Sequence, residues 1–273
     1  MPSVVSSNIN LFTEYAFIYK RICKNEDCQI LQNDLNNLVK WEKLWSMEFH
    51  TDKCKVLCIT NKQNTTNFTY SMDTTDLETI KEAKYLGINM HRKLSWKNHI
   101  SEITTKANQT RQFLQRSLAT CAPDVKLQCY KTFVRPIVGY SSTIWDPVGN
   151  KMLQNKLESV QKKSVRWICN NWDNRCSSSA MEKKLNLPSL SERREKSRLK
   201  MFHNIYHGHK FLPANMIPNR ARSKDIRFKQ IFGRINSYAN SFIPLTIQQW
   251  NMLPASIVNV EETTLFERNL ASI

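Results

Sequence analysis

The chain has 273 residues, of which 41% are hydrophobic and 10% aromatic, enough for one large ordered domain or two small ones. The chain has only five glycines and nine prolines, and this low content excludes a linker-rich or disordered chain. No apolar run reaches the length of a transmembrane helix, and the polar N-terminal segment is unlike a secretory signal.

The net charge of +17, from 40 basic and 23 acidic residues, is unevenly distributed. Residues 1–100 hold 13 basic and 11 acidic residues, whereas residues 101–273 hold 27 and 12. Residues 151–234 alone hold 20 basic and 6 acidic residues. The positive charges of so basic a block repel one another, so the block favours a polyanionic partner. Nucleic acid is the leading candidate for this partner. A merely soluble basic surface remains the alternative.

The eight cysteines predict reduced, mostly buried thiols, because no secretion signal accompanies them. The set nearest to a metal site is Cys169 and Cys176 with His203 and His207. Its spacing fits zinc poorly, and we expect no metal there.

The first elements along the chain predict a small α+β layer. Residues 9–12 and 16–22 favour two strands around a polar turn, because they are β-branched and aromatic. From Asp27, apolar residues recur every three or four positions up to Trp45, which predicts a helix. Residues 53–60, 68–72 and 85–90 then favour strands. This order suggests that a helix covers one face of a sheet.

After Leu94 the pattern is mainly helical. Pro123 starts one helix, and Pro136 should kink or split it. The helix from Ser191 carries a dense basic face. Residues 208–245 read as loops with one strand. The helical segments are expected at residues 100–118, 123–140, 151–172, from 191 onward, 246–253 and 264–271.

Several sequence blocks occur in a consistent order. They are LFTEYAFIY at 11–19, the helix end at 41–47 with KCKVL at 53–57, KYLG at 84–87, LSWKNHI at 94–100, FVRPIVGYSSTIWDP at 133–147, LESVQ at 157–161 and WNxLP at 250–254. In order and spacing they resemble the reverse transcriptases of non-LTR (LINE-type) retrotransposons, the jockey-like branch in particular. Each block alone is weak evidence for the resemblance. Together the blocks extend over residues 9–270.

The resemblance implies three regions: a partial reverse transcriptase palm at 1–93, a helical thumb-like region at 94–175, and a basic C-terminal helical region at 176–273. The implied fold class is α+β. A partial palm-type antiparallel sheet with a covering helix precedes the mainly helical thumb and C-terminal region.

Two departures from the family predict an inactive polymerase. Polymerases of this class use two Mg²⁺ ions, which carboxylates and substrate phosphates hold. Glu14 and Tyr15 replace the family's aspartate pair, and a tyrosine supplies no anionic oxygen at pH 7. The chain also starts about ten residues before this hairpin, leaving no room for the earlier palm aspartate. We therefore expect no catalytic residue and no cofactor, and aspartates at both positions should not restore activity.

The expected partner is RNA or DNA, bound without sequence preference by basic residues. Trp167 and Trp172 are candidates to stack on bases, although as helical residues each is better explained as core. The candidate nucleic-acid-binding residues are Lys53, Lys84, Gly87, Arg92, Lys162, Lys163, Arg166, Arg193, Arg194, Lys196, Arg198 and Lys200.

Three readings of the function stay open. In the first, the chain is a decayed transposon product. In the second, it is an element-derived nucleic-acid-binding protein. In the third, it is part of a polymerase whose missing half lies upstream. In each case we expect an intracellular location, in cytoplasm or nucleus, with no membrane partner and no small-molecule substrate. The sequence leaves the oligomeric state open.

Overall fold

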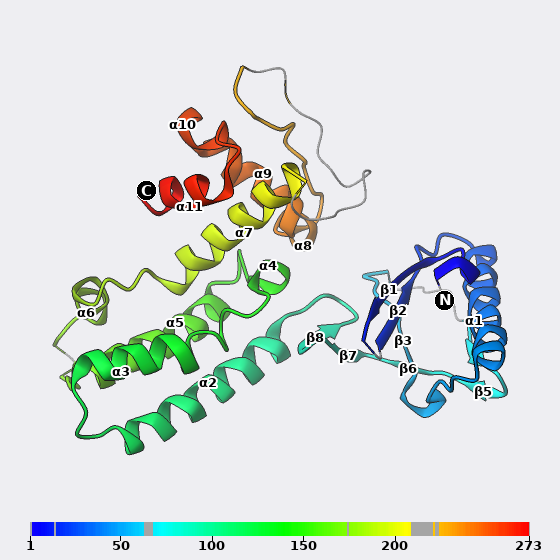
Figure 1. Cartoon of the computed structure of the whole chain (residues 1–273), viewed down its shortest axis with the longest axis horizontal. Helices are drawn as coiled ribbons and strands as arrows, with labels where there is room; N and C mark the ends of the chain where they lie inside the picture. Colours follow the sequence, from blue (N-terminus) through cyan, green and yellow to red (C-terminus); the bar gives the residue numbers. More distant parts are fainter. Residues whose placement is uncertain are drawn as a thin grey trace. The chain divides into compact units, whose positions relative to one another are not determined.

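The computed structural model describes residues 2–13, 15–62, 68–173, 175–208, 221 and 224–272. The chain forms two compact units, Met1–Ser95 and Trp96–Ile273, and Figure 1 labels most of their helices and strands. The sequence suggests three regions, with boundaries after residues 93 and 175. In the structure the residues on both sides of 175 belong to one unit.

The first unit combines one long helix with short strands, as an α+β class requires. Its elements are η1 (Pro2–Val4), β1 (Asn8–Phe12), β2 (Tyr15–Tyr19), α1 (Asn25–Trp45), η2 (Thr51–Lys53), β3 (Lys55–Leu57), β4 (Ser71–Met72), β5 (Thr75–Asp76), β6 (Glu78–Ile80), β7 (Glu82–Tyr85) and β8 (Ile88–His91).

The strands do not form the single antiparallel sheet that the sequence suggests. In the described residues they form four two-stranded ladders: β1–β2, β4–β5 and β7–β8 are antiparallel, and β3–β6 is parallel. Most of these strands have only two to four residues. Runs this short give too little periodicity to identify their ladder partners from sequence.

The segment 85–90 is a tight hairpin, and the prediction of one strand there is wrong. Leu86 and Gly87 both have positive φ, at 46° and 81°, and they form the two-residue turn between β7 and β8. Glycine takes this conformation without strain, and two successive positive φ angles match the twist of a hairpin. Gly87 therefore serves the turn.

Helix α1 holds the first unit together by packing and by polar contacts. Leu38 and Val39 join Tyr70 and Met72 in its core. The Gln32 side chain donates to the Ser71 carbonyl and accepts from the Ser71 amide, both at 2.9 Å. These two hydrogen bonds tie α1 to β4, because the Gln32 side chain bonds to both the amide and the carbonyl of Ser71.

The second unit is helical. Its elements are α2 (Lys97–Ser117), α3 (Pro123–Cys129), the π-helix η3 (Tyr130–Val134), α4 (Ser142–Trp145), α5 (Lys151–Ile168), α6 (Ser178–Lys184), α7 (Leu190–Tyr206), α8 (Asn236–Ala239), α9 (Phe242–Met252), α10 (Ala255–Val258) and α11 (Thr263–Ala271). The helices expected at 100–118, 151–172, from 191, 246–253 and 264–271 are thereby confirmed. The short helices α4, α6, α8 and α10 were not expected from the sequence. Residues 208–245 were expected to be loops with one strand, but their described part, 208, 221 and 224–245, holds α8 and the start of α9 and no strand.

The helix from Pro123 changes its winding before Pro136, as predicted. The Arg135 amide donates to the Tyr130 carbonyl at 2.9 Å, an i to i−5 bond of the π type. A proline ring clashes with the carbonyl four residues earlier, and a wider turn relieves this clash. The chain then continues in turns up to Ser141.

Two groups of buried side chains hold the helices of this unit in place. Helix α2 packs on α5, and the buried Tyr130 hydroxyl donates to Gln161 Oε1 at 2.8 Å. Further along the chain, Phe202 of α7, Trp250 of α9 and Phe266 of α11 pack in one aromatic cluster. Helix α7 reaches both groups, since it also contacts α4 and α5.

Candidate nucleic-acid interface

Helix α7 begins at a well-capped N-terminus. The Ser189 hydroxyl accepts from the Glu192 amide at 3.0 Å. The Glu158 carboxylate of α5 accepts from the amides of Leu190 and Ser191, at 3.1 and 2.7 Å. An anion at this end of a helix is favourable, so Glu158 both caps α7 and fixes it on α5.

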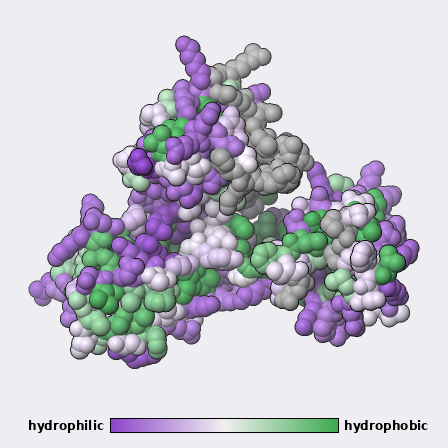
Figure 2. All heavy atoms as spheres, in the orientation of Figure 1, coloured by the Kyte–Doolittle hydropathy of each residue, from purple (hydrophilic) through white to green (hydrophobic). Residues whose placement is uncertain are grey.

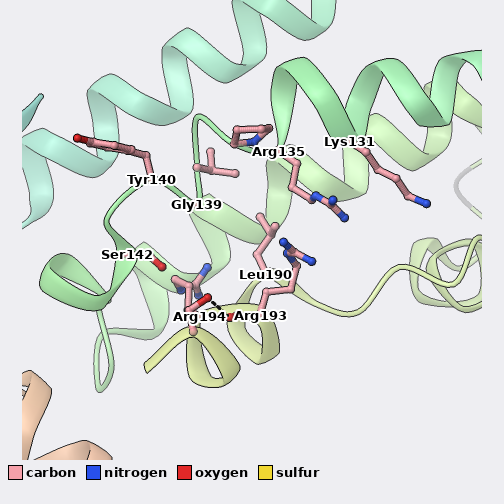
Figure 3. Close-up of a pocket in the computed structure, with 11 residues that line it drawn as sticks. Lys131, Arg135, Gly139, Tyr140, Ser142, Leu190, Arg193 and Arg194 are labelled. Carbon is pink, nitrogen blue, oxygen red and sulfur yellow. Dashed lines mark hydrogen bonds between the residues drawn. The ribbon is translucent and has the colours of Figure 1, made fainter. Parts of the chain in front are cut away.

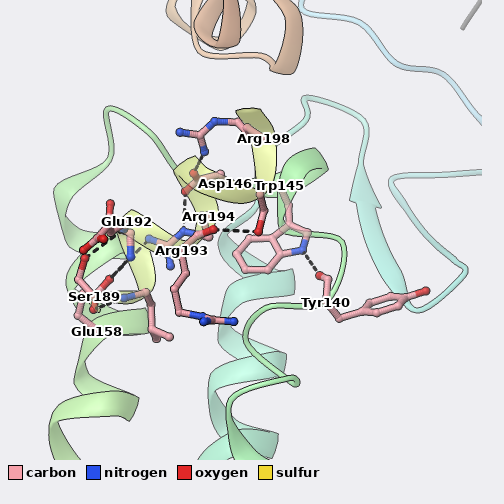
Figure 4. A network of polar contacts seen from close by, with 12 residues as sticks. Tyr140, Trp145, Asp146, Glu158, Ser189, Glu192, Arg193, Arg194 and Arg198 are labelled. Atoms are coloured by element: carbon pink, nitrogen blue, oxygen red, sulfur yellow. Dashed lines mark hydrogen bonds and ion pairs between the residues drawn. The ribbon is translucent and has the colours of Figure 1, made fainter. Parts of the chain in front are cut away.

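Asp146, just after α4, binds two arginines of α7 (Figure 4). Its Oδ1 accepts from Arg194 Nε at 2.8 Å, and its Oδ2 pairs with Arg198. The Asp146 side chain is 6% exposed and both arginines are 2% exposed. Burial lowers the pKa of Arg194 below its usual value, and it lowers the pKa of Arg198 to about 10.

The prediction that the basic residues of α7 share one exposed face is therefore wrong for Arg194 and Arg198. Arg198 also donates to Gln249 Oε1 of α9, at 3.3 and 3.1 Å. Charged groups enter a protein interior only when paired and hydrogen-bonded, and Asp146 makes this possible. Through Asp146 the two arginines hold α7 against α4, and Arg198 also joins α7 to α9.

The remaining basic residues of α7 differ in how far they are neutralised. Arg193 is exposed and its side chain extends away from the Asp146 network (Figure 4). Lys196 pairs with Glu192 at 2.9 Å, and Lys200 pairs with Glu267 of α11. Exposed pairs such as these exchange readily with solvent and with other anions.

On α5, the three predicted residues have two different roles. Lys162 and Lys163 are exposed, and neither has an ion pair in the described part of the chain. Arg166 donates to the carbonyls of Asp173 and Cys176, at 2.8 and 3.0 Å, and so holds the loop after α5. Lys162 and Lys163 are free to meet an external anion.

Two basic residues that the sequence analysis did not select lie beside Arg193. Lys131 and Arg135, one turn apart on the η3 segment, line a hollow of about 340 Å³ together with Arg193 and Arg194 (Figure 3). Burial lowers the pKa of Arg135, and the nearby Arg193 guanidinium lowers it further. Arg135 lies within the 133–147 block, which is the one signal that could have identified it.

The two tryptophans proposed for stacking have different surroundings. Trp167 is 3% exposed and belongs to the core, so it cannot stack on a base. Trp172 is 49% exposed. Elsewhere on the unit, α2 and α3 expose apolar side chains such as Phe113 and Val125, and hydrophobic residues gather over these helices in Figure 2. That face does not suit a phosphate backbone.

The other predicted binding residues belong to the first unit. Lys53 and Lys84 are exposed, and Gly87 forms the β7–β8 turn. Arg92 is half-buried, and its backbone joins the segments on either side: its amide donates to Lys81 and its carbonyl accepts from Thr60. The structure leaves the binding role of these four residues as a prediction.

Comparison with curated proteins identifies relatives of this chain. Over 215 residues, 76% of the chain, it is 25% identical to the "Probable RNA-directed DNA polymerase from transposon BS" of Drosophila melanogaster. It is 23% identical over 153 residues to the corresponding protein of the transposon X-element from the same fly. It is 26% identical over 163 residues to the RNA-directed DNA polymerase from mobile element jockey of Drosophila funebris.

The chain is similar to the reverse transcriptases of jockey-like non-LTR retrotransposons. The resemblance seen in the sequence blocks is thus confirmed. The chain spans 23%, 17% and 17% of the lengths of these three relatives. No family model matches it, and no solved structure does.

Strands β1 and β2 pair as an antiparallel hairpin, as the sequence predicts. Phe12 of β1 pairs with Tyr15 of β2 across the turn, and Tyr15 is 56% exposed. Glu14 lies outside the described residues. Tyr15 supplies no anionic oxygen at pH 7, and the loss of the Mg²⁺ site stays a prediction from the sequence.

Over the described ranges, no group of three or more His, Cys, Asp or Glu side chains is placed to hold a metal ion. Cys169 and Cys176 are free and half-buried, and His203 is buried with its Nε2 2.8 Å from the Val260 carbonyl. No helix in the described parts has the length and apolar character to cross a membrane.

Proposed function

We propose that this chain is a retrotransposon-derived polypeptide that binds the RNA or DNA backbone without sequence preference and does not polymerise. The observation that carries the proposal is the set of exposed cations on α5 and at the start of α7. Lys162, Lys163 and Arg193 lack ion pairs within the described residues, although the unit also supplies carboxylates.

Two physical arguments support this reading. Cations that no carboxylate of the chain neutralises are available to phosphates, and each phosphate contact releases condensed counterions. The unit also binds several of its acidic residues internally, because Asp146 and Glu158 hold α7 in place. With the buried Arg194 and Arg198 these two carboxylates form a neutral set, so the positive excess of the unit remains on its other residues.

The proposal includes no metal-dependent chemistry. Mg²⁺ serves the polymerases of this family through carboxylate ligands, and Tyr15 stands where the family has an aspartate. A neutral tyrosine at this position leaves the hairpin short of one anionic ligand. A polypeptide that keeps a nucleic-acid-binding surface without catalysis also fits the alternative of an element-derived binding protein.

A salt titration of binding tests the proposal. The full chain, mixed with a fluorescent single-stranded oligonucleotide, should bind with a Kd on the order of micromolar at low salt and lose affinity steeply as salt rises. The double variant Lys162→Gln/Lys163→Gln should lower the slope of log K against log salt by roughly 1 to 1.5, since each single-strand contact contributes about 0.7.

The matched control removes two lysines that are already paired. Lys196→Gln/Lys200→Gln changes the net charge by the same amount, and it should alter the slope by less than half as much. No binding at low salt, or binding that salt does not weaken, would refute the proposal. Equal effects of the two double variants would place the interface elsewhere than on α5.

A further inference from the structure

A hollow lies between the η3 segment and the start of α7. Its volume is about 340 Å³, and Pro136, Gly139, Tyr140 and Leu190 line it beside basic and hydroxyl side chains. In Figure 3 the Arg135 and Arg193 side chains reach into the same space from two different elements, while the Tyr140 ring points away from them. The volume falls at the lower end of the range for small-ligand sites.

Three cations line this hollow without a carboxylate partner. Lys131, Arg135 and Arg193 have no ion pair and no side-chain hydrogen bond within the described residues. The Arg193 guanidinium is close enough to Arg135 to lower its pKa, in addition to the effect of burial. Two like charges held this close favour an anion between them.

The nearest carboxylates are already bound to other groups. Asp146 pairs with Arg194 and Arg198, and Glu158 caps the first amides of α7. Because Glu158 occupies the N-terminus of α7, an external anion in the hollow would be held by side chains. Guanidinium groups bind phosphate through two parallel N–H···O bonds, and Lys131 would add a third positive charge.

We propose that this hollow binds a terminal phosphate group of RNA or DNA, a phosphomonoester with a charge near −2. Such a group carries about −1.5 to −2 at pH 7, whereas an internal phosphodiester carries about −1. Only the terminal group can balance most of the charge of three cations. Ser142 and Ser197 add hydroxyl groups to the lining. The proposal rests on the nucleic-acid binding proposed above; free phosphate shares the same chemistry.

Oligonucleotides that differ only in their ends test the proposal. The full chain is titrated with one labelled single strand carrying a 5′-phosphate, a 3′-phosphate or hydroxyl groups at both ends. We expect one phosphorylated form to bind about tenfold more tightly than the hydroxyl form, because charge-assisted hydrogen bonds to a dianion are the strong ones. Arg135→Gln and Arg193→Gln should each reduce this ratio of Kd values to between one and two.

The control variant is Arg116→Gln, an exposed arginine of α2 outside the hollow, and it should keep the ratio. In a second arm, inorganic phosphate is compared with sodium chloride of equal ionic strength. Phosphate should raise the thermal midpoint of the wild-type chain, because ligand binding stabilises the folded state, and leave Arg135→Gln/Arg193→Gln unchanged.

The outcomes separate the two proposals. If all oligonucleotides bind equally and phosphate has no specific effect, the hollow is not a phosphate site, while general nucleic-acid binding stands. If no oligonucleotide binds but phosphate stabilises the wild type alone, the proposed function fails and the hollow takes free phosphate. A ratio that persists in both arginine variants overturns the assignment to this hollow.

Discussion

The Asp146 carboxylate accepts from two arginines that lie one turn apart on α7, and so it decides which cations of that helix reach solvent. Arg194 and Arg198 are inside, whereas Arg193, one position away from Arg194, faces the hollow. Helical spacing places Arg194 and Arg198 on the same face as Leu190, but it does not identify the carboxylate on another element that pairs with them.

Asp146→Asn should destabilise the second unit by about 3–5 kcal/mol, since it leaves two buried guanidinium groups without an anion. The free energy of unfolding can be measured by urea denaturation of the full chain. Glu192→Gln, which removes only the half-exposed pair with Lys196, is the control and should cost about 0.5 kcal/mol or less. Equal losses for the two variants would show that the Asp146 network contributes little.

At the scale of elements, the N-terminal segment is fixed on α1 by one side chain. Asp34 is 2% exposed, and its carboxylate accepts from the amides of Ser6 and Ser7, both at 2.8 Å. Burial raises the pKa of Asp34, but the hydrogen bonds from Ser6 and Ser7 outweigh it and hold the pKa below its usual value. Helix α1 thereby anchors the chain just before β1.

This shift predicts a pH dependence for the first unit. A carboxyl group whose pKa is lowered by folding stabilises the fold above its unfolded pKa of about 3.9, and this contribution disappears as the pH falls through the folded value. At pH 7, Asp34→Asn should cost about 1–3 kcal/mol, and near pH 2 the difference from wild type should nearly vanish.

Fluorotryptophan resonances of Trp41 and Trp45, both on α1, can report the unfolding of this unit in urea. Asp73→Asn is the control, because Asp73 makes only an exposed pair with Lys43. It should change stability by less than about 1 kcal/mol at either pH. An Asp34→Asn deficit that is the same at both pH values would contradict the role given to the ionised carboxylate.

Among the elements, the long helices were predictable and the strands less so. Helices α1, α2, α5 and α7 show apolar repeats over 17 residues or more, and such repeats carry enough turns to be read without a partner. Pro136 predicted an interruption of the helix from Pro123, but its π winding was not predicted. The β7–β8 hairpin was missed because a two-residue turn at Leu86 and Gly87 interrupts what looks like one apolar run.

At the scale of the whole molecule, the charge is divided between the two units. Residues 1–100 carry a nearly balanced set, while the helical remainder carries most of the +17. The hairpin with Tyr15 lies in the first unit, and the hollow with its three cations lies in the second. The proposed binding therefore does not depend on the hairpin chemistry.

The purified chain should extend no primer on an RNA or DNA template, with magnesium or with manganese. Tyr15 removes one anionic ligand from the hairpin. Even a displacement of a catalytic group by about 1 Å costs on the order of 100-fold in rate. A retroviral reverse transcriptase in parallel reactions is the positive control. Measurable extension by the purified chain, free of contaminating polymerase, would overturn the proposal of inactivity.

The sequence by itself determined the relationship to jockey-like reverse transcriptases, the α+β class and the long helices, because blocks in order and helical periodicity are local properties. Only the tertiary structure decided which cations are available. Arg194 and Arg198 are neutralised by a carboxylate 48 and 52 residues away, whereas Lys131 and Arg135 meet Arg193 across a hollow. Pairing at such separations depends on how helices pack, and helix packing cannot be read from the spacing of residues along one helix.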